Sequence, residues 1–84
     1  MKSFLTRVDP AKGMARFYAV MIWPSLFGDY TLVREWGRIG QGGTVRGRSY
    51  ATEAEARHVA TGIVSAKARR GYRVIETDTG TDCR

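Results

Sequence analysis

The sequence predicts an α+β fold, an antiparallel β-sheet of about four to five strands with one α-helix packed on one face. Several short runs of alternating, β-branched and aromatic residues lie between clusters of Gly, Pro and Asp, which is typical of antiparallel strands joined by turns. One later segment starts with a capping signal and repeats its apolar residues at helical spacing. Because 84 residues bury only one modest core, we expect a single domain over residues 1–75 and a flexible polar tail over residues 76–84.

The first two strands are predicted over residues 4–8 and 17–23. Pro10 and Gly13 lie between them and favour a turn. The second run is aromatic and branched, is too short for a typical helix, and ends at Pro24, so it favours a strand.

A loop is predicted over residues 25–29, and it contains the apolar pair Leu26 and Phe27. We expect this pair to cover the core. The alternative is an exposed contact for a partner.

Residues 30–39 and 44–50 are predicted to form two neighbouring strands around the glycine-rich turn 40–43. Alternation places five side chains of the first strand on one face, namely Tyr30, Leu32, Arg34, Trp36 and Arg38. In the second strand it groups Thr44, Arg46, Arg48 and Tyr50. Each strand therefore contributes two arginines to one face.

A helix is predicted to begin at the capping box Thr52–Glu55. Its apolar positions form one stripe that we expect to lie against the sheet, consisting of Ala56, Val59, Ala60, Ile63 and Val64. Cations that suit the end of a helix dipole follow before Gly71, which favours termination. Residues 72–75 are expected to add a short edge strand.

The charge balance indicates an anionic partner, because fourteen Lys and Arg residues oppose eight Asp and Glu residues, for a formal net charge of +6. Only three of the cations are lysines. Arginine presents a planar fork of donors that suits phosphate, although a GC-rich genome is an equally good reason for the bias.

Little in the sequence predicts catalysis. His58 and Cys83 are the only residues of their kinds and have no partners at metal-ligand spacing. The glycines from Gly37 to Gly43 precede a strand rather than a helix, which argues against a nucleotide-binding loop. We therefore expect no enzyme, no cofactor, no metal and no small-molecule substrate. With no sustained apolar stretch and a single cysteine, we expect a cytoplasmic protein that has no membrane contact.

The segment Arg34-Glu35-Trp36-Gly37-Arg38-Ile39-Gly40 resembles the WGR domain of DNA-dependent poly(ADP-ribose) polymerases and of short bacterial proteins. Trp23-Pro24-Ser25-Leu26-Phe27-Gly28 and Arg69-Arg70-Gly71-Tyr72 extend the resemblance, which covers residues 4–75. It implies an antiparallel sheet with one helix and a role in recognising DNA breaks. It also implies that Trp36 and Arg38 lie against DNA, with Gly37 allowing close approach. Whether this chain recognises breaks, ordinary duplex or another protein stays open.

We expect Trp36 to project into water between Arg34 and Arg38, where an indole can stack on a sugar or base while the arginines hold phosphates. The alternative is a core tryptophan whose neighbouring arginines extend outward. Arg46 and Arg48 either extend the phosphate-binding surface or are plain surface charge. A further cluster is interpreted as helix-end electrostatics and consists of Lys67, Arg69, Arg70 and Arg73.

The predicted function is nucleic-acid binding, with DNA as the partner, through six residues: Arg34, Trp36, Gly37, Arg38, Arg46 and Arg48. The alternative function is a protein-interaction module that recruits an acidic partner protein.

Overall fold

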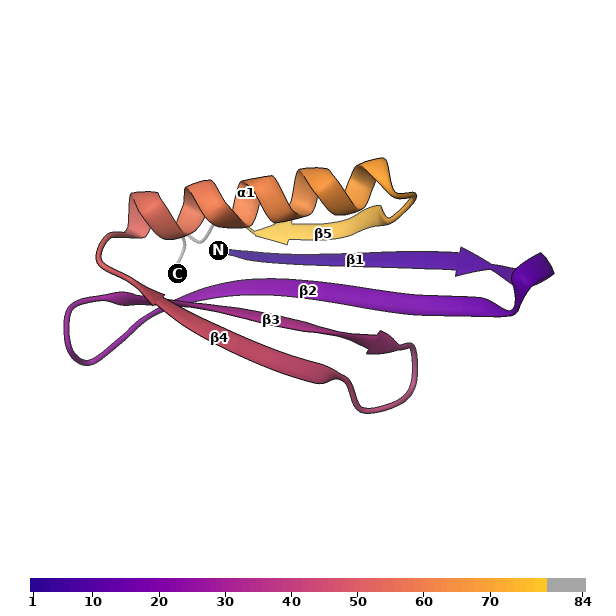
Figure 1. Ribbon diagram of the computed structural model, residues 1–84, viewed down its shortest axis with the longest axis horizontal. Coiled ribbons are helices and arrows are strands. Elements are labelled where there is room, and N and C mark those ends of the chain that lie inside the picture. The colour runs from indigo at the N-terminus through magenta and orange to yellow at the C-terminus, as the bar shows by residue number, and fades with distance from the viewer. Residues whose placement is uncertain (79–84) are drawn as a thin grey trace.

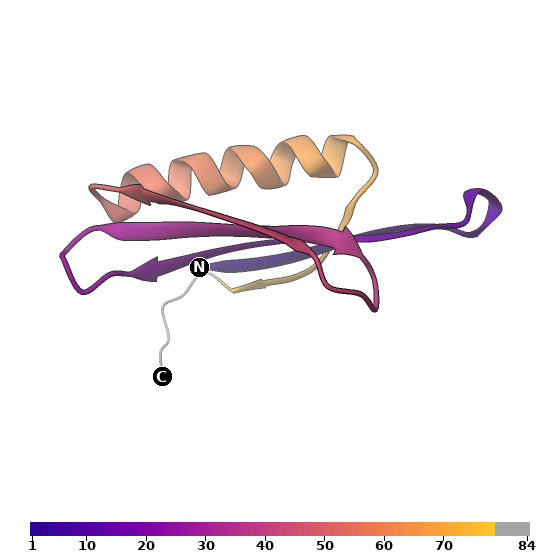
Figure 2. The same ribbon diagram turned by 60° about the horizontal axis from the view of Figure 1, so that its bottom comes forward.

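The computed structural model describes the backbone of residues 1–78 and the side chains of residues 1–75 (Figure 1). One five-stranded sheet has the strand order β4-β3-β2-β1-β5, and every pair of neighbours is antiparallel. One helix lies on one face of the sheet, so the predicted α+β class is confirmed (Figure 2). The elements are β1 (Lys2–Asp9), the 3-10 helix η1 (Pro10–Lys12), β2 (Met14–Pro24), β3 (Tyr30–Arg38), β4 (Thr44–Tyr50), α1 (Glu53–Arg69) and β5 (Arg73–Asp78).

The first two strands are longer than the sequence predicts. Their ladder runs from Lys2 opposite Met21 to Asp9 opposite Met14. The predicted turn is the 3-10 helix, with Pro10 in its first turn and Gly13 closing it at φ 62°. Backbone pairing carries β1 and β2 through residues of weak strand propensity, because every second pair added to an antiparallel ladder gains hydrogen bonds whatever its side chains.

The loop between β2 and β3 does not cover the core, so that prediction is wrong. Leu26 is 98% exposed and Phe27 is 92% exposed. The loop closes on itself: the Ser25 N–H donates to the Asp29 carbonyl over 2.9 Å, and the Phe27 N–H donates to the Ser25 hydroxyl over 3.0 Å. The Ser25 hydroxyl in turn hydrogen-bonds the Asp29 carboxylate. These contacts fix the loop as an ordered tip that presents two apolar side chains to solvent.

The helix begins as predicted, with the Thr52 hydroxyl accepting a hydrogen bond of 3.1 Å from the Glu55 N–H. Ala56 and Ala60 are fully buried, and their small side chains let α1 approach the sheet closely. The helix contacts β2, β3 and β4. The predicted stripe is confirmed, since all five of its residues belong to the core or pack against it. The sheet contributes Leu5, Tyr18, Val20, Ile22 and Leu32 to this core.

Strand β5 extends beyond the predicted edge strand. It pairs with β1 up to Asp78 opposite Lys2, so the predicted domain boundary at residue 75 falls inside a strand. Its last residues are polar, and only their pairing with β1 identifies them as part of the sheet. The rest of the predicted tail, residues 79–84, lies outside the described residues.

The helix is shorter than the sheet face on which it lies. The β1–β2 hairpin projects past the end of α1 in both views (Figures 1 and 2). One end of the helix-bearing face is therefore not covered by the helix. Among the helices of residues 1–78, none combines the length and the apolar character that crossing a lipid bilayer would require.

Candidate nucleic-acid interface

Arg34, Trp36 and Arg38 share one face of β3, as predicted, and it is the face that carries α1. Leu32, two residues before Arg34, is buried in the core beneath the helix, and alternation sets the following even-numbered residues on the same side. Burial decreases along the strand toward its end, from Leu32 in the core through half-buried Trp36 to exposed Arg38. The expectation that the indole projects freely into water needs correction, because Trp36 packs against the edge of the core.

The Trp36 indole belongs to an aromatic cluster made of Tyr18, Trp36 and Tyr72. Its ring stacks on Tyr18 with centroids 5.7 Å apart and planes inclined by 14°. Tyr72 meets Tyr18 edge-on, with centroids 6.4 Å apart. Because Tyr18 is buried and fixed by the core, the stacked indole has a defined orientation while part of its surface stays in contact with solvent.

Two cations lie against this aromatic cluster. The Arg34 Cζ atom is 5.7 Å from the centre of the Trp36 ring. The Lys67 Nζ atom is 4.6 Å from the centre of the Tyr18 ring and 5.7 Å from that of Tyr72. The sequence predicts Lys67 as a helix-end cation, and in the structure its ammonium group also lies over the aromatic cluster. Cation–π contacts thus hold Arg34 beside the indole and Lys67 beside the two tyrosines.

Three arginines form a row across neighbouring strands just beyond the aromatic cluster. Arg7 of β1 lies directly opposite Arg16 of β2, and Arg16 lies directly opposite Arg38 of β3. Alternation from Leu5, Tyr18 and Trp36 places all three on the helix-bearing face. We call Arg7, Arg16 and Arg38 the arginine row. Like charges directly opposite each other destabilise a sheet, so the row marks a place where an anion would be favourable.

Sequence reasoning missed two members of this row. The second strand predicted from the sequence starts at residue 17, so its alternation does not include Arg16. Arg7 is likewise two residues after Leu5 in the first strand. A period of two counted from each core residue identifies both arginines once the strands are paired.

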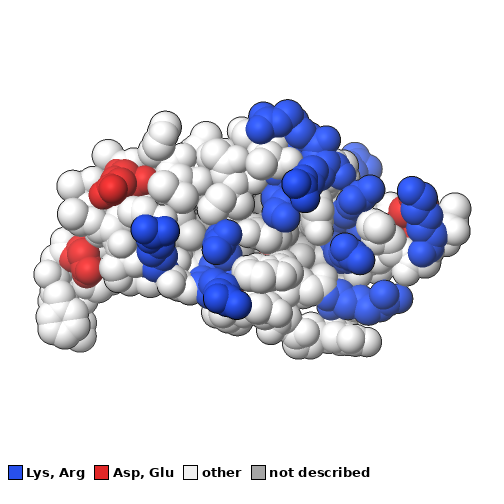
Figure 3. All heavy atoms as spheres, in the orientation of Figure 1, with Lys and Arg blue, Asp and Glu red and all other residues white. Residues whose placement is uncertain are grey.

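The row adjoins the end of α1 on one side and the β1–β2 turn on the other. A Cβ atom built on Gly71, the residue after the helix cap, would lie 3.3 Å from Nε of Arg7. The Arg38 guanidinium donates a hydrogen bond of 3.3 Å to the Gly13 carbonyl. Lysine and arginine side chains gather over the half of this face where α1 ends (Figure 3). The end of α1 and the arginine row thus contribute to one positive region, whereas Arg73 of the predicted helix-end cluster lies opposite Thr6 and faces the other side of the sheet.

No ion pair neutralises these arginines among the described side chains, although Asp9 alternates to the same face two residues after Arg7. Among the side chains of residues 1–75, the ion pair recorded joins Arg57 to Glu53 over 3.0 Å, at the start of α1. Glu35 alternates to the opposite face of β3. Cations therefore outnumber carboxylates on the helix-bearing face of the described residues.

Gly37 does not join Trp36 and Arg38, because it faces the other side of the sheet. A Cβ atom there would lie 3.0 Å from the Gly43 Cα and 3.5 Å from the Gly42 carbonyl oxygen. The turn between β3 and β4 thus folds closely over Gly37. This packing is a sufficient physical reason for a glycine between the tryptophan and the arginine.

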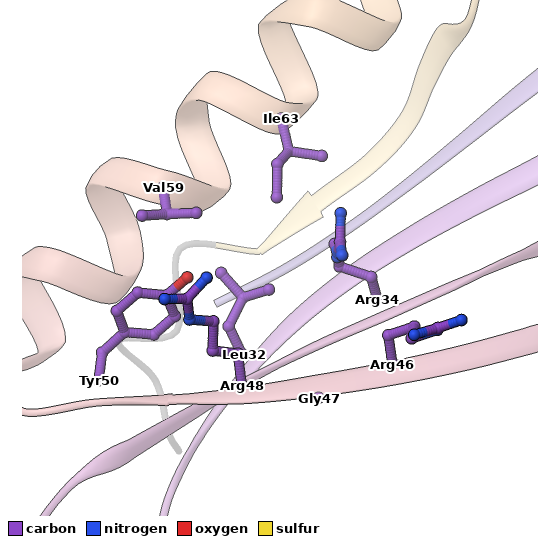
Figure 4. A pocket seen from close by; sticks show the side chains of 8 residues that line it. All are labelled: Leu32, Arg34, Arg46, Gly47, Arg48, Tyr50, Val59 and Ile63. Carbon is purple, nitrogen blue, oxygen red and sulfur yellow. The ribbon is translucent and has the colours of Figure 1, made fainter.

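Arg46 and Arg48 of β4 lie on the helix-bearing face. Arg46 is directly opposite Arg34, a further pair of like charges, and Arg48 is opposite Leu32. Both line a groove between α1 and the β3–β4 hairpin (Figure 4). The groove lies on the other side of Trp36 from the arginine row, so Arg34 connects the two positive regions.

Comparison with known proteins supports the resemblance seen in the sequence. The WGR domain family model matches residues 1–79. The chain is 41% identical over 70 residues to the uncharacterized protein y4dW of Sinorhizobium fredii, an alignment that covers 83% of this chain and 34% of that protein. The chain therefore spans about a third of the length of this relative.

A crystal structure of a Bacteroides fragilis protein has the same fold. It superposes with a TM-score of 0.75 at 17% sequence identity, over 90% of this chain and 20% of the other. WGR domains are regarded as nucleic-acid-binding domains. With a family match over nearly the whole chain and Trp36, Gly37 and Arg38 at the motif positions, this chain belongs to the WGR domain family.

Proposed function

We propose that this chain binds nucleic acid, and DNA in particular, through the part of the helix-bearing face that lies beyond the end of α1. The observation that carries the proposal is the arginine row, in which Arg7, Arg16 and Arg38 are direct partners across three strands. Like charges directly opposite each other destabilise a sheet, by an amount on the order of the 0.2–1 kcal/mol that favourable cross-strand pairs contribute. A bound phosphate backbone would reverse the sign of that interaction.

The spacing of the row suits a chain of phosphates. Neighbouring strands are about 4.8 Å apart, so the three arginines leave the sheet along a line of about 10 Å. Arginine forks can hold phosphate oxygens in a bidentate manner. Contacts of this kind position a duplex or strand without reading its sequence, which predicts binding with strong salt dependence and little sequence preference.

Trp36 supplies a different kind of contact. Its indole is half-buried and stacked on Tyr18, so a sugar or an end base can pack on the exposed part without ordering a mobile side chain. The resemblance to polymerases that recognise DNA breaks makes a strand end the first substrate to test. We propose that the chain binds nucleic acid and does not catalyse a reaction.

The proposal is tested by fluorescence anisotropy with labelled blunt, nicked and recessed duplexes and with single strands. We expect Arg38→Gln to weaken binding by about tenfold, corresponding to about 1.4 kcal/mol. Lys2→Gln is the matched control, because it removes the same charge from an exposed residue that alternates to the opposite face of β1. Equal affinities of parent and Arg38→Gln, or equal losses in both variants, would contradict the proposed surface.

A second candidate function is recruitment of an acidic partner protein. The loop between β2 and β3 favours it, because Leu26 and Phe27 are exposed on an ordered tip and Trp23 beside them is 55% exposed. We expect a pull-down from nuclease-treated lysate to recover a stoichiometric acidic protein with the parent and not with a Leu26→Ser, Phe27→Ser variant. Recovery by both, or by neither, would count against this function.

A further inference from the structure

A groove separates α1 from the β3–β4 hairpin and lies apart from the arginine row. It has a volume of about 400 Å³, within the range of about 300–1,000 Å³ typical of small-ligand sites. Two elements of different kinds form it, as Figure 4 shows: α1 contributes Val59 and Ile63 on one side, and β3 and β4 contribute the other residues.

The groove has an apolar part and a cationic part. Val59 and Ile63 point from the helix toward the sheet, where they and Leu32 form an apolar wall (Figure 4). Both helix residues are only partly buried, so their surface remains available to a ligand. A flat, weakly polar ring is the kind of group that such a wall accommodates.

Arginines supply the cationic part. Arg34 and Arg46 are direct partners across the β3–β4 ladder, and the Arg48 Cζ atom is 5.8 Å from the centre of the Tyr50 ring. No carboxylate is among the groove-lining residues, and none of the three arginines forms an ion pair with another side chain of residues 1–75. Three unpaired guanidinium groups around a small groove select an anionic group with several acceptor oxygens.

The composition of β4 is not what helix packing alone would favour. The β4 side chains that face the helix begin with Thr44, Arg46 and Arg48, and only Tyr50 at the strand's end packs on the core. Apolar residues at positions 46 and 48 would close the space beneath Val59 and Ile63 and enlarge a small core. The arginines instead keep this space open and positively charged.

We propose that the groove holds one nucleoside monophosphate unit. The base lies against Leu32, Val59 and Ile63, and the phosphate lies on Arg46 and Arg48. Arg34 borders both this groove and Trp36, so a strand bound along the arginine row can place an unpaired nucleotide in the groove. This strand-borne form rests on the proposed function, whereas a free mononucleotide would occupy the groove independently of it.

The first test is an NMR titration of the full chain with deoxyadenosine monophosphate, with inorganic phosphate and with deoxyadenosine. We expect the mononucleotide to shift the amide signals of Val59, Ile63 and residues 46–48, and each of its two halves alone to bind at least about tenfold more weakly. Arg48→Gln should weaken the binding of the mononucleotide by about fivefold or more, and Lys2→Gln should leave that affinity unchanged.

The second test separates the two sources of the nucleotide. A blunt duplex is compared with the same duplex carrying one unpaired nucleotide, using the parent, Arg48→Gln and Arg46→Gln. We expect the unpaired nucleotide to improve binding by about fivefold and both variants to abolish that gain. If the unpaired nucleotide improves duplex affinity in the parent only, and the free mononucleotide does not bind, the groove is specific for a nucleotide that is part of a strand.

The outcomes for the two proposals differ. If the mononucleotide shifts no groove signal and the unpaired nucleotide gives no gain, the groove proposal is overturned even where blunt duplex still binds through the arginine row. If the mononucleotide binds and no nucleic acid does, the groove proposal stands and the proposed function fails. A shift that Arg46→Gln and Arg48→Gln both leave unchanged would place the nucleotide elsewhere and overturn the groove.

Discussion

Arg16 lies directly opposite Arg38 across the β2–β3 ladder, and the two guanidinium groups leave the same face of the sheet, where neither forms an ion pair with a side chain of residues 1–75. Arg7 continues the pairing on β1. If these residues contributed only to the stability of the sheet, a neutral residue at one of the positions would make the sheet more stable. Substituting an arginine of the row should therefore change both the free energy of unfolding and the affinity for DNA, and both can be measured.

Replacing Arg16 with Gln should affect stability and binding in opposite directions. The free energy of unfolding is expected to rise by about 0.2–1 kcal/mol, because two like-charge pairs disappear. Affinity for DNA is expected to fall, because one phosphate contact disappears. Urea denaturation and anisotropy measure the two effects, with Lys2→Gln as the control. A clear loss of stability would show instead that Arg16 supports the framework.

Salt should stabilise the free protein. Ions at about 0.1 M screen exposed charges separated by more than about 10 Å, and they also weaken repulsion between closer exposed groups. We expect the Tm to rise between low and moderate sodium chloride, and to rise less in an Arg16→Gln, Arg34→Gln variant. The measurement is thermal unfolding followed by circular dichroism. A Tm that is independent of salt would argue that these arginines do not repel one another appreciably.

Trp36 should report binding by its fluorescence. Trp23 lies at the far end of β2, so a Trp23→Phe variant leaves Trp36 as the sole indole of the chain. We expect the emission of this variant to be quenched and shifted on adding DNA, because the exposed part of the indole becomes covered. Trp36→Phe, which keeps Trp23, is the control and should respond little. The reverse pattern would place the contact at the β2–β3 loop.

In the turn after β3, an alanine substitution should destabilise the fold at Gly43 and have little effect at Gly42. A Cβ atom on Gly43 would lie 2.6 Å from the Trp36 carbonyl oxygen and 2.9 Å from Cζ of Phe17, whereas one on Gly42 would meet nothing within 4 Å. Gly43→Ala is therefore expected to destabilise the fold by about 1–3 kcal/mol, and Gly42→Ala by much less. Equal effects in chemical denaturation would mean that this packing is looser than the structure shows.

Much of the fold follows from local signals in the sequence. The Thr52 cap, the apolar stripe of α1 and the alternation of β3 are each set by a few neighbouring residues, so pattern alone predicts them. The lengths of β1 and β5 depend on pairing between distant segments. For this reason the ladder continues to Asp78 through polar residues that no local pattern assigns to a strand.

The candidate site was predictable only in part, because alternation sorts side chains into two faces without showing which face the helix covers. Leu32 and Val33 lie on opposite faces of β3, and tertiary packing buries Leu32. The position of Trp36 at the margin of the core follows from the length of α1 relative to the sheet. The exposure of Leu26 and Phe27 likewise depends on hydrogen bonds that close their loop.

The salt dependence of DNA binding tests the central claim most directly, by comparing the parent with an Arg7→Gln, Arg16→Gln, Arg38→Gln variant and with Lys2→Gln. Each phosphate contact contributes about 0.9 to the slope of log affinity against log salt concentration. If the arginine row holds the backbone, the triple variant should lose about two to three units of slope, and Lys2→Gln should keep the parent's value. Parallel lines for all three proteins would contradict the account.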